Sequence, residues 1–253
     1  MISVAVSGAA GRMGSLVAAT VSAAADLELA ACFDPRGLGT AGGRAVTADP
    51  ADLSGADVVV EFTTPDVVMQ NLAVWREMNL NAVVGTSGFD EARLAALTIQ
   101  WGSGPPNCLV VPNFSIGAVL MMRFAEMAAP HFAASEVIEL HHDRKADAPS
   151  GTALATAAAM RAAGGRQERA VESAELVEGA RGADAGGVRV HAVRLPGLLA
   201  HQEVLLGSEG EVLTIRHDTT DRAAFMPGVL LGIRAVAGLT RPVTVGIQGL
   251  LGL

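Results

Sequence analysis

The 253-residue chain lacks long apolar runs, although half of its residues are hydrophobic. A membrane-spanning helix needs about 20 consecutive apolar residues, and no stretch of this sequence reaches that length. The first apolar run, from Ser3 to Ser7, has no basic segment ahead of it, so a secretory signal is not predicted. We therefore expect a cytoplasmic globular protein with one large domain or two smaller ones.

Cysteine and clusters of basic residues are also scarce. Cys32 and Cys108 lie on separate apolar stretches and belong to no C-x-x-C or metal-ligand spacing, so both are interpreted as small buried hydrophobic residues. The net charge is -8 and the basic residues form no runs, which argues against nucleic acid or an anionic membrane as a partner. Small molecules are therefore the favoured ligands.

Lysine is nearly absent, because 17 of the 18 basic residues are arginine and only Lys145 is lysine. An ammonium group is more compact than a guanidinium and loses its proton more readily. A lone lysine thus indicates either a position that needs such a group or a surface position retained by chance. Its neighbours in the sequence decide between the two.

Strand-like and helical stretches alternate over about the first 114 residues. The predicted strands are the apolar runs 2–7, 27–33, 57–62, 81–86 and 107–112. The predicted helices are 13–25, 66–78 and 90–101. Such runs are typical of parallel strands buried on both faces, with crossovers that return over a face of the sheet. The pattern predicts an α/β fold with a Rossmann-like doubly wound parallel sheet.

The pattern changes after a further helix at 115–129. Longer strands with less helix between them are predicted at 136–142, at 188–195 and in the segments HQEVLLG and EVLTIRH. They suggest a second α+β domain with a mixed sheet. Residues 164–187 are polar and rich in glycine, which predicts a long, mobile surface loop. A last helix near 223–237 and the VTVGI run are expected to return to the first domain.

Three glycines, Gly8, Gly11 and Gly14, follow the first strand and open a helix. Such a turn lets the backbone approach a pyrophosphate, and the helix start presents unpaired amides to it. The acidic residue expected to bind a ribose hydroxyl is Asp34, at the end of the second strand. The G-x-x-G-x-x-G spacing departs from the commoner G-x-G-x-x-G, and such a turn can be purely structural. Strand, helix and acid together favour a dinucleotide site.

The preference between NADH and NADPH stays open. Asp34 favours NADH because a carboxylate accepts from the ribose and repels a 2'-phosphate. Arg12 and Arg36, however, lie near enough in the sequence to neutralise that phosphate.

The segment 139–153 concentrates chemically active side chains. His141 and His142 precede Lys145, and both residue types can supply a proton and attract carboxylates. If the histidines lie on a strand, they face opposite sides and their roles differ. Metal ligation by the pair with Asp143 is also conceivable, but neighbouring histidines on a strand diverge and no H-x-x-x-H spacing is present, so no metal site is predicted.

A Pro-Ser-Gly-Thr turn at the end of this segment opens an Ala-rich helix. The amides and hydroxyls of Ser150, Gly151 and Thr152 predict an anion site at the helix start. Taken singly, the histidines are best explained as a structural pair and Ser150 as a helix cap. Their convergence within 12 positions of the lone lysine favours a cradle for a dicarboxylate.

Over essentially its whole length the sequence resembles the dihydrodipicolinate reductases, now usually called 4-hydroxy-tetrahydrodipicolinate reductases. The matching segments are GAAGRMG (8–14), EFTTPD (61–66), VGTSGF (84–89), VPNFSIGAVL (111–120), ELHHDRKADAPSGTA (139–153), VRLPGLLAHQEVLLG, TIRHD and DRAAFMPGVLLGIRAV. The HHxxKxDAPSGTA run is highly specific to that family. The resemblance implies reduction of 4-hydroxy-tetrahydrodipicolinate to tetrahydrodipicolinate by hydride from NADH and/or NADPH, in the diaminopimelate route to lysine.

The resemblance also implies roles for individual residues. His141 becomes the proton donor or acceptor, and Lys145 the second proton donor. Substrate contacts fall on His142, Ser150, Gly151 and Thr152. Cofactor contacts fall on Gly8, Ala9, Ala10, Gly11, Arg12, Met13, Asp34, Gly85, Thr86, Ser87, Val111, Pro112, Asn113 and Phe114. Ser87 stands where family members commonly have threonine, and Asp34 stands where some members have glutamate. Both are mild departures from the family pattern.

The resemblance implies that two domains bind the dinucleotide and the substrate separately. Residues 1–114 and 220–253 are expected to bind the dinucleotide, and 115–219 to bind substrate and form a homotetramer through the second sheet. Closure about hinges near 114 and 219 is expected to exclude water. Two other interpretations are a related dehydrogenase, such as an aspartate dehydrogenase, and an inactive NAD-binding sensor. Neither needs the combination of His141, Lys145 and the PSGT turn.

Overall fold

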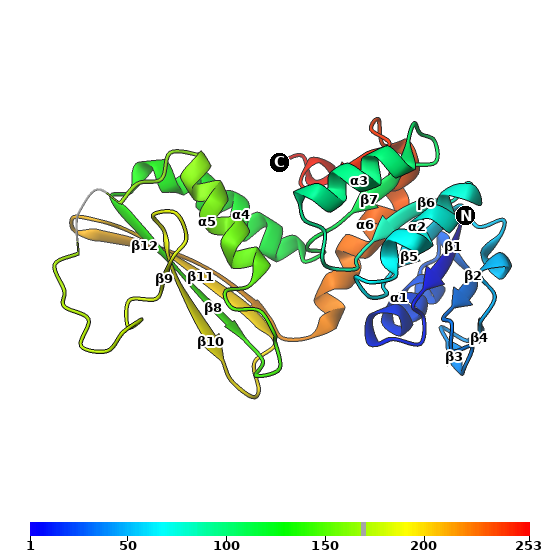
Figure 1. The fold of residues 1–253 in the computed structure, drawn as a ribbon, viewed down its shortest axis with the longest axis horizontal. Coiled ribbons are helices and arrows are strands. Elements are labelled where there is room, and N and C mark those ends of the chain that lie inside the picture. Colours follow the sequence, from blue (N-terminus) through cyan, green and yellow to red (C-terminus); the bar gives the residue numbers. More distant parts are fainter. Residues whose placement is uncertain (168–170) are drawn as a thin grey trace. The chain divides into compact units, whose positions relative to one another are not determined.

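The computed structural model describes residues 1–167 and 171–253, which form two compact units (Figure 1). Unit 1 comprises Met1–Ser115 and Phe225–Leu253, and unit 2 comprises Ile116–Ala224. Each unit has its own sheet and its own buried core. In the described part of the chain, no helix combines the length and apolar character needed to cross a membrane.

Unit 1 is built on an eight-stranded sheet of order β13-β7-β6-β5-β1-β2-β4-β3. Its strands are β1 (Ile2–Ser7), β2 (Leu27–Phe33), β3 (Thr40–Ala41), β4 (Arg44–Thr47), β5 (Val58–Glu61), β6 (Asn81–Val84), β7 (Cys108–Val110) and β13 (Val243–Val245). All neighbouring strands pair in parallel except β3 with β4. The predicted Rossmann-like sheet is confirmed. The short β3–β4 hairpin was not predicted, because its strands are largely exposed and form no continuous apolar run.

Helices cover both faces of this sheet (Figure 1). They are α1 (Arg12–Ala23), α2 (Val68–Glu77), α3 (Glu91–Trp101) and α6 (Met226–Ala235), with short 3-10 segments η1 (Pro50–Leu53), η4 (Val236–Gly238) and η5 (Gly249–Leu251). α1 contacts α6, whereas α2 contacts α3. The predicted last helix is divided into η3 (Arg222–Phe225), α6 and η4. The strand order reverses at β1, and ligands bind at such a switch point in open α/β sheets.

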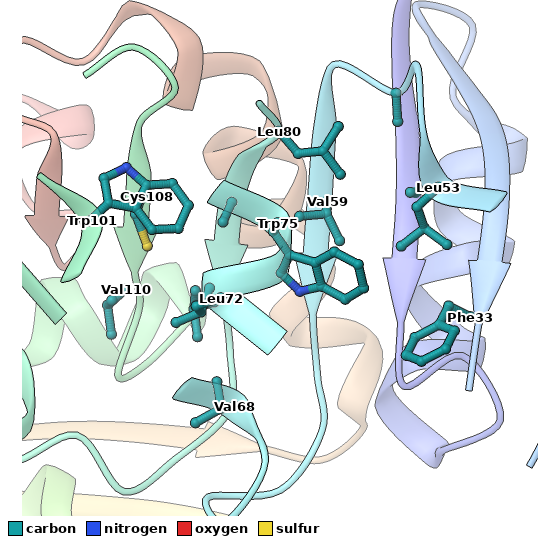
Figure 2. Packing of buried hydrophobic residues seen from close by; sticks show 14 of the residues in the cluster. Phe33, Leu53, Val59, Val68, Leu72, Trp75, Leu80, Trp101, Cys108 and Val110 are labelled. Atoms are coloured by element: carbon teal, nitrogen blue, oxygen red, sulfur yellow. The ribbon is translucent and has the colours of Figure 1, made fainter. Parts of the chain in front are cut away.

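Two buried tryptophans dominate the core between the sheet and α2 and α3 (Figure 2). The ring of Trp75 meets Phe33 edge to face, with the centroids 5.8 Å apart. Trp101 donates its indole N–H to the carbonyl of Pro106 at 2.8 Å, so its burial leaves no unpaired donor. Cys32 and Cys108 are both buried, as predicted, and burial raises the pKa of each thiol.

Unit 2 is built on a five-stranded mixed sheet of order β12-β11-β8-β10-β9, which confirms the predicted sheet type. The strands are β8 (Ala134–His141), β9 (Ala183–Asp184), β10 (Arg189–Arg194), β11 (Ala200–Ser208) and β12 (Glu211–Thr219). β10 is parallel to β8, and the other pairs are antiparallel. Helices α4 (Ile116–Ala128) and α5 (Gly151–Ala162) pack on one face, and η2 (Ala129–His131) follows α4 (Figure 1).

Alternate residues of the β strands face these helices. Val137, Val204 and Leu206 form the core with Ala157 and Met160 of α5. Strand β8 begins two residues before the predicted strand and ends one residue before it, at His141, so His142 lies in the turn that follows. In the predicted loop 164–187, residues 168–170 lie outside the described residues, and β9 is the regular element in the remainder.

Candidate functional site

The glycine turn of unit 1 requires glycine for steric reasons. Gly8 has φ +78°, and a Cβ on it would lie 2.2 Å from the carbonyl oxygen of Phe62. A Cβ on Gly14 would lie 2.1 Å from the carbonyl oxygen of Gly8. The turn, the start of α1 and the end of β5 therefore approach too closely to admit a side chain. Such close approach is what a dinucleotide-binding turn needs.

The start of α1 is open to an anion. Its N-cap is Gly11, no side chain caps the helix, and the first turn contains no acidic residue. In α3, by contrast, the Asp90 side chain accepts from the Arg93 amide. The partial positive charge at the start of α1 is thus left for a ligand.

A cavity of about 910 Å³ lies beside this turn, within unit 1. It is large enough for a small-molecule ligand. The predicted cofactor residues that line it are Gly8, Gly11, Arg12, Met13, Asp34, Gly85, Thr86 and Ser87. The other six predicted residues do not line it, namely Ala9, Ala10, Val111, Pro112, Asn113 and Phe114. The glycine cradle, the uncapped helix and the cavity together fit a dinucleotide.

Asp34 lies at the end of β2 and is engaged by Arg36. The guanidinium donates to its two carboxylate oxygens, from Nε at 2.8 Å and from Nη2 at 3.0 Å. These bonds outweigh the effect of burial and, with the backbone amides of Arg36 and Ala10, lower the pKa of Asp34. Asp34 is 5% exposed, whereas the Arg36 side chain is 64% exposed. The acid therefore remains ionised, and an exposed cation neutralises it at the edge of the cavity.

Sequence analysis missed Glu61, the last residue of β5. Its side chain is fully buried and accepts from the indole N–H of Trp75 at 2.8 Å and from Asn71 Nδ2 at 3.2 Å. The hydroxyl of Thr63 also donates to it, and the Thr63 amide donates to Thr86 Oγ1 at 2.9 Å. Glu61 thus supports three residues that line the cavity, namely Thr63, Asn71 and Trp75. The available signal was a lone acid ending an apolar strand.

His141 ends β8 in unit 2 and is bound to another buried carboxylate. Its Nδ1 lies 2.5 Å from Oε2 of Glu139, two residues earlier on the same face of the strand. Glu139 also accepts from Nη1 and Nη2 of Arg194, both at 2.8 Å, and from the Ser150 amide at 3.0 Å. The roles of Glu139 and Arg194 were missed in the sequence analysis. The signal for Glu139 was an acid in phase with the buried residues of β8.

The pKa shifts of this pair define its charge state. Burial raises the pKa of Glu139, but hydrogen bonds from Arg194 and His141 more than offset it, so the pKa lies below its usual value. Burial lowers the pKa of His141 despite the opposing effect of Glu139. At neutral pH, Glu139 is ionised and His141 is neutral. Because an ionised carboxylate only accepts, the imidazole carries its proton on Nδ1 and has its lone pair on Nε2.

Lys145 and His142 lie in the turn after β8. The ammonium of Lys145 donates to Asp147 at 2.7 Å, and this bond is the main reason that the pKa of Asp147 is lowered. Arg194 also donates to the carbonyl of Asp147, at 2.5 Å. Nδ1 of His142 is buried and has no hydrogen-bond partner among the described residues. Such an atom needs an explanation in a folded protein, and a ligand-binding role supplies one.

The start of α5 closes this network. Ser150 is its N-cap, with a hydroxyl that accepts from the Ala153 amide at 3.2 Å, and the residue is 2% exposed. Both its amide and its hydroxyl are thus engaged within the protein. A Cβ on Gly151 would meet nothing within 4 Å, so the helix start is open at this position. Among the described residues, no group of three or more His, Cys, Asp or Glu is arranged to hold a metal ion.

Comparison with known proteins gives matches over the whole chain. The models named Dihydrodipicolinate reductase, N-terminus and C-terminus, match residues 2–114 and 117–251. The 4-hydroxy-tetrahydrodipicolinate reductase of Cutibacterium acnes is 54% identical over 258 residues and covers 100% of both chains. That of Thermobifida fusca is 52% identical over 257 residues, with the same coverage.

A solved structure supports the same assignment. The dipicolinate-bound dihydrodipicolinate reductase from Paenisporosarcina sp. TG-14 is 37% identical and superposes with a TM-score of 0.84, over 98% of this chain and 99% of that one. Both units are therefore accounted for by one family. The chain belongs to the dihydrodipicolinate reductase family.

Proposed function

We propose that the glycine turn of unit 1 binds NADH or NADPH, and that the segment from Glu139 to Thr152 in unit 2 binds the dicarboxylate and supplies the proton. The reaction follows from family membership. The chain is an NAD(P)H-dependent oxidoreductase that reduces 4-hydroxy-tetrahydrodipicolinate to tetrahydrodipicolinate, in the diaminopimelate route to lysine. The assignment of roles rests on one observation: His141, Arg194 and the start of α5 converge on the carboxylate of Glu139.

The cofactor supplies a hydride when bound. Gly8 and Gly14 allow the backbone to approach its pyrophosphate, and the uncapped α1 supplies positive charge to the phosphates. Asp34 and Arg36 face the ribose, the carboxylate suiting a hydroxyl and the guanidinium suiting a 2'-phosphate. The remaining proposed contacts are Ala9, Ala10, Gly11, Arg12, Met13, Gly85, Thr86, Ser87, Val111, Pro112, Asn113 and Phe114.

The residues of unit 2 bind the substrate and move its proton. The start of α5 at Gly151 and Thr152 binds one carboxylate, with Ser150 holding that turn in place. His142 is a further substrate contact, since its buried Nδ1 has no partner among the described residues. Lys145 delivers a proton from its ammonium, and His141 exchanges one at Nε2. His141 must first take up a proton in order to donate one, because its lowered pKa keeps it neutral at rest.

A coupled assay tests these roles. The condensation product of pyruvate and aspartate semialdehyde is supplied, and oxidation of NADH and of NADPH is followed separately. His141→Ala and Lys145→Ala are each expected to lower kcat by about 100-fold or more, the scale of general acid–base catalysis. The KM for the nucleotide is expected to change little. Exposed Arg144, next to Lys145, provides the control Arg144→Ala. Unchanged turnover in either variant rejects the role of that residue.

We also propose that the enzyme acts in the cytoplasm as a homotetramer assembled through the face of the unit 2 sheet opposite α4 and α5. The register places Ile138, Leu140 and Leu205 on that face, together with Val212, which is 70% exposed. A second sheet face would cover these apolar side chains. Sedimentation equilibrium tests this: the native chain is expected to sediment as a tetramer and Val212→Arg as a smaller species. A monomer at all concentrations rejects the assembly.

A further inference from the structure

Glu139 occupies a position where a core hydrophobic residue is expected. Ser135 and Val137 precede it on the inner face of β8, and both are buried. The Glu139 side chain is 0% exposed. A buried carboxylate is costly unless it is paired and hydrogen-bonded. Apolar packing cannot be the reason for glutamate at this position, so the reason lies in its partners.

Three elements supply those partners. Oε1 accepts from Arg194 Nη2 and from the Ser150 amide, and Oε2 accepts from Arg194 Nη1 and from His141 Nδ1. Each oxygen therefore has two donors, which is its full capacity. Arg194 on β10 and Ser150 at the start of α5 hold the carboxylate from two directions, whether or not His141 is present. The carboxylate is thus a fixed point against which the imidazole is oriented.

We infer that Glu139 is a positioning residue for the proposed proton transfer. It holds His141 as the Nδ1–H tautomer, keeps Nε2 available for the substrate, and connects the imidazole to the start of α5 that binds the substrate carboxylate. Arg194 keeps Glu139 ionised and so maintains this tautomer. The inference rests on the proposed function of His141, but the tautomer itself can be observed without any assay of activity.

The charged groups around the His141 imidazole determine how its pKa responds to the loss of Glu139. The groups that face His141 are Glu139, Lys145 and Arg194. Asp147 accepts from Lys145 through its carboxylate and from Arg194 through its backbone carbonyl. Of these charged groups, only Glu139 raises the pKa of His141, and the two cations lower it together with burial. Glu139→Gln removes the negative charge and leaves both cations. The one amide oxygen that remains is shared with Arg194 and the Ser150 amide, so the imidazole loses its dedicated acceptor and its pKa falls further.

Nitrogen-15 NMR of histidine-labelled protein tests the tautomer directly, with the His141 signal assigned from His141→Gln. The native chain is expected to show the Nδ1–H form at pH 8. Glu139→Gln is expected to lose that preference and to lower the His141 pKa, and Glu139→Asp to retain the Nδ1–H form in part. In turnover assays, Glu139→Gln is expected to lower kcat roughly 10- to 100-fold, with the falling limb of the pH profile moved to lower pH.

The opposite face of the same strand offers a matched control. Glu136 lies on β8 and accepts from His191 Nε2 at 2.7 Å and from Arg181, which is the same set of residue types. Glu136→Gln is expected to change the signals of His191 and leave those of His141 as in the native chain. A change in both would mean that carboxylate loss acts through general disturbance of the sheet, which rejects the inference.

The possible results distinguish failure of the positioning role of Glu139 from failure of the proton-transfer role of His141. An Nε2–H tautomer in the folded native chain overturns the positioning role, and it does so even if Glu139→Gln fails to fold. A native tautomer and pH profile in folded Glu139→Gln overturn it as well. If His141→Ala retains full turnover while the tautomer is found as expected, the proton-transfer function fails and the structural relationship stands.

Discussion

Arg36 donates two hydrogen bonds to the carboxylate of Asp34, from Nε at 2.8 Å and from Nη2 at 3.0 Å, and both residues line the unit 1 cavity. The pair joins the carboxylate that we propose to disfavour NADPH to a cation that we propose to favour it. The acid alone repels a 2'-phosphate, whereas the ion pair presents almost no net charge. We therefore propose that nucleotide preference in this chain is set by the pair rather than by Asp34 alone.

Arg36→Ala is expected to shift the preference toward NADH. The uncompensated Asp34 carboxylate then repels the 2'-phosphate, and the ratio of kcat/KM for NADPH to that for NADH should fall roughly 10-fold, the size of one charge-assisted contact of about 1.4 kcal/mol. Asp34→Asn should move the ratio in the opposite direction. Exposed Arg166, in unit 2, serves as the control position. Equal ratios in all three variants would show that neither residue determines specificity.

Gly8→Ala is expected to cost more stability than the same change at Gly43. Both glycines have positive φ, +78° and +83°, so both substitutions carry the backbone strain of a left-handed alanine, about 1–2 kcal/mol. A Cβ on Gly43 meets nothing within 4 Å, whereas on Gly8 it meets the Phe62 carbonyl. Urea denaturation gives the free energy of unfolding, and NADH titration gives affinity. Only Gly8→Ala should weaken NADH binding; equal effects would contradict the steric argument.

Trp75→Phe is expected to destabilise the chain more than Trp101→Phe. Each indole is about 1% exposed, and each variant removes one N–H donor. Trp75 donates to the carboxyl group of Glu61, which also accepts from Asn71 and Thr63, whereas Trp101 donates to the backbone carbonyl of Pro106. A single hydrogen bond contributes about 0.5–1.5 kcal/mol, and a bond that belongs to a buried network contributes more than its pairwise value. Urea denaturation measures the difference. A larger loss in Trp101→Phe would mean that Glu61 does not depend on this donor.

Acidification is expected to lower the free energy of unfolding, in part through Glu139 and His141. The pKa of Glu139 lies below 4.5, so the ionised form stabilises the fold above that pH and the stabilisation is lost as pH falls through the folded pKa. The pKa of His141 lies below 6.5, so the unfolded chain binds this proton more readily and stability decreases as pH falls below about 6.5. Between pH 7 and 5, His141→Gln should show a shallower decrease. An identical slope would contradict the lowered pKa.

Local sequence patterns were sufficient for most of the fold. Apolar runs of strand length, separated by helical stretches, are a property of neighbouring residues, and they predicted both sheets and every α-helix. Gly8, Gly11 and Gly14 were identifiable because a turn between a buried strand and a helix has a short-range signature. The segment from His141 to Thr152 was identifiable because its chemistry is contiguous. The strands β3 and β4 were not predicted because they are largely exposed and form no continuous apolar run.

The sequence by itself determined the family, the two sheet types and the positions of His141, Lys145 and the α5 start. The tertiary structure decided which charges meet. Arg194 is 55 residues from Glu139 and reaches it because β10 pairs in parallel with β8, with Arg194 opposite His141. Glu61 accepts the hydrogen bond from the Trp75 indole only when α2 packs on the sheet. Strand register and crossover packing bring such residues together, and neither can be predicted from the residues adjacent along the chain.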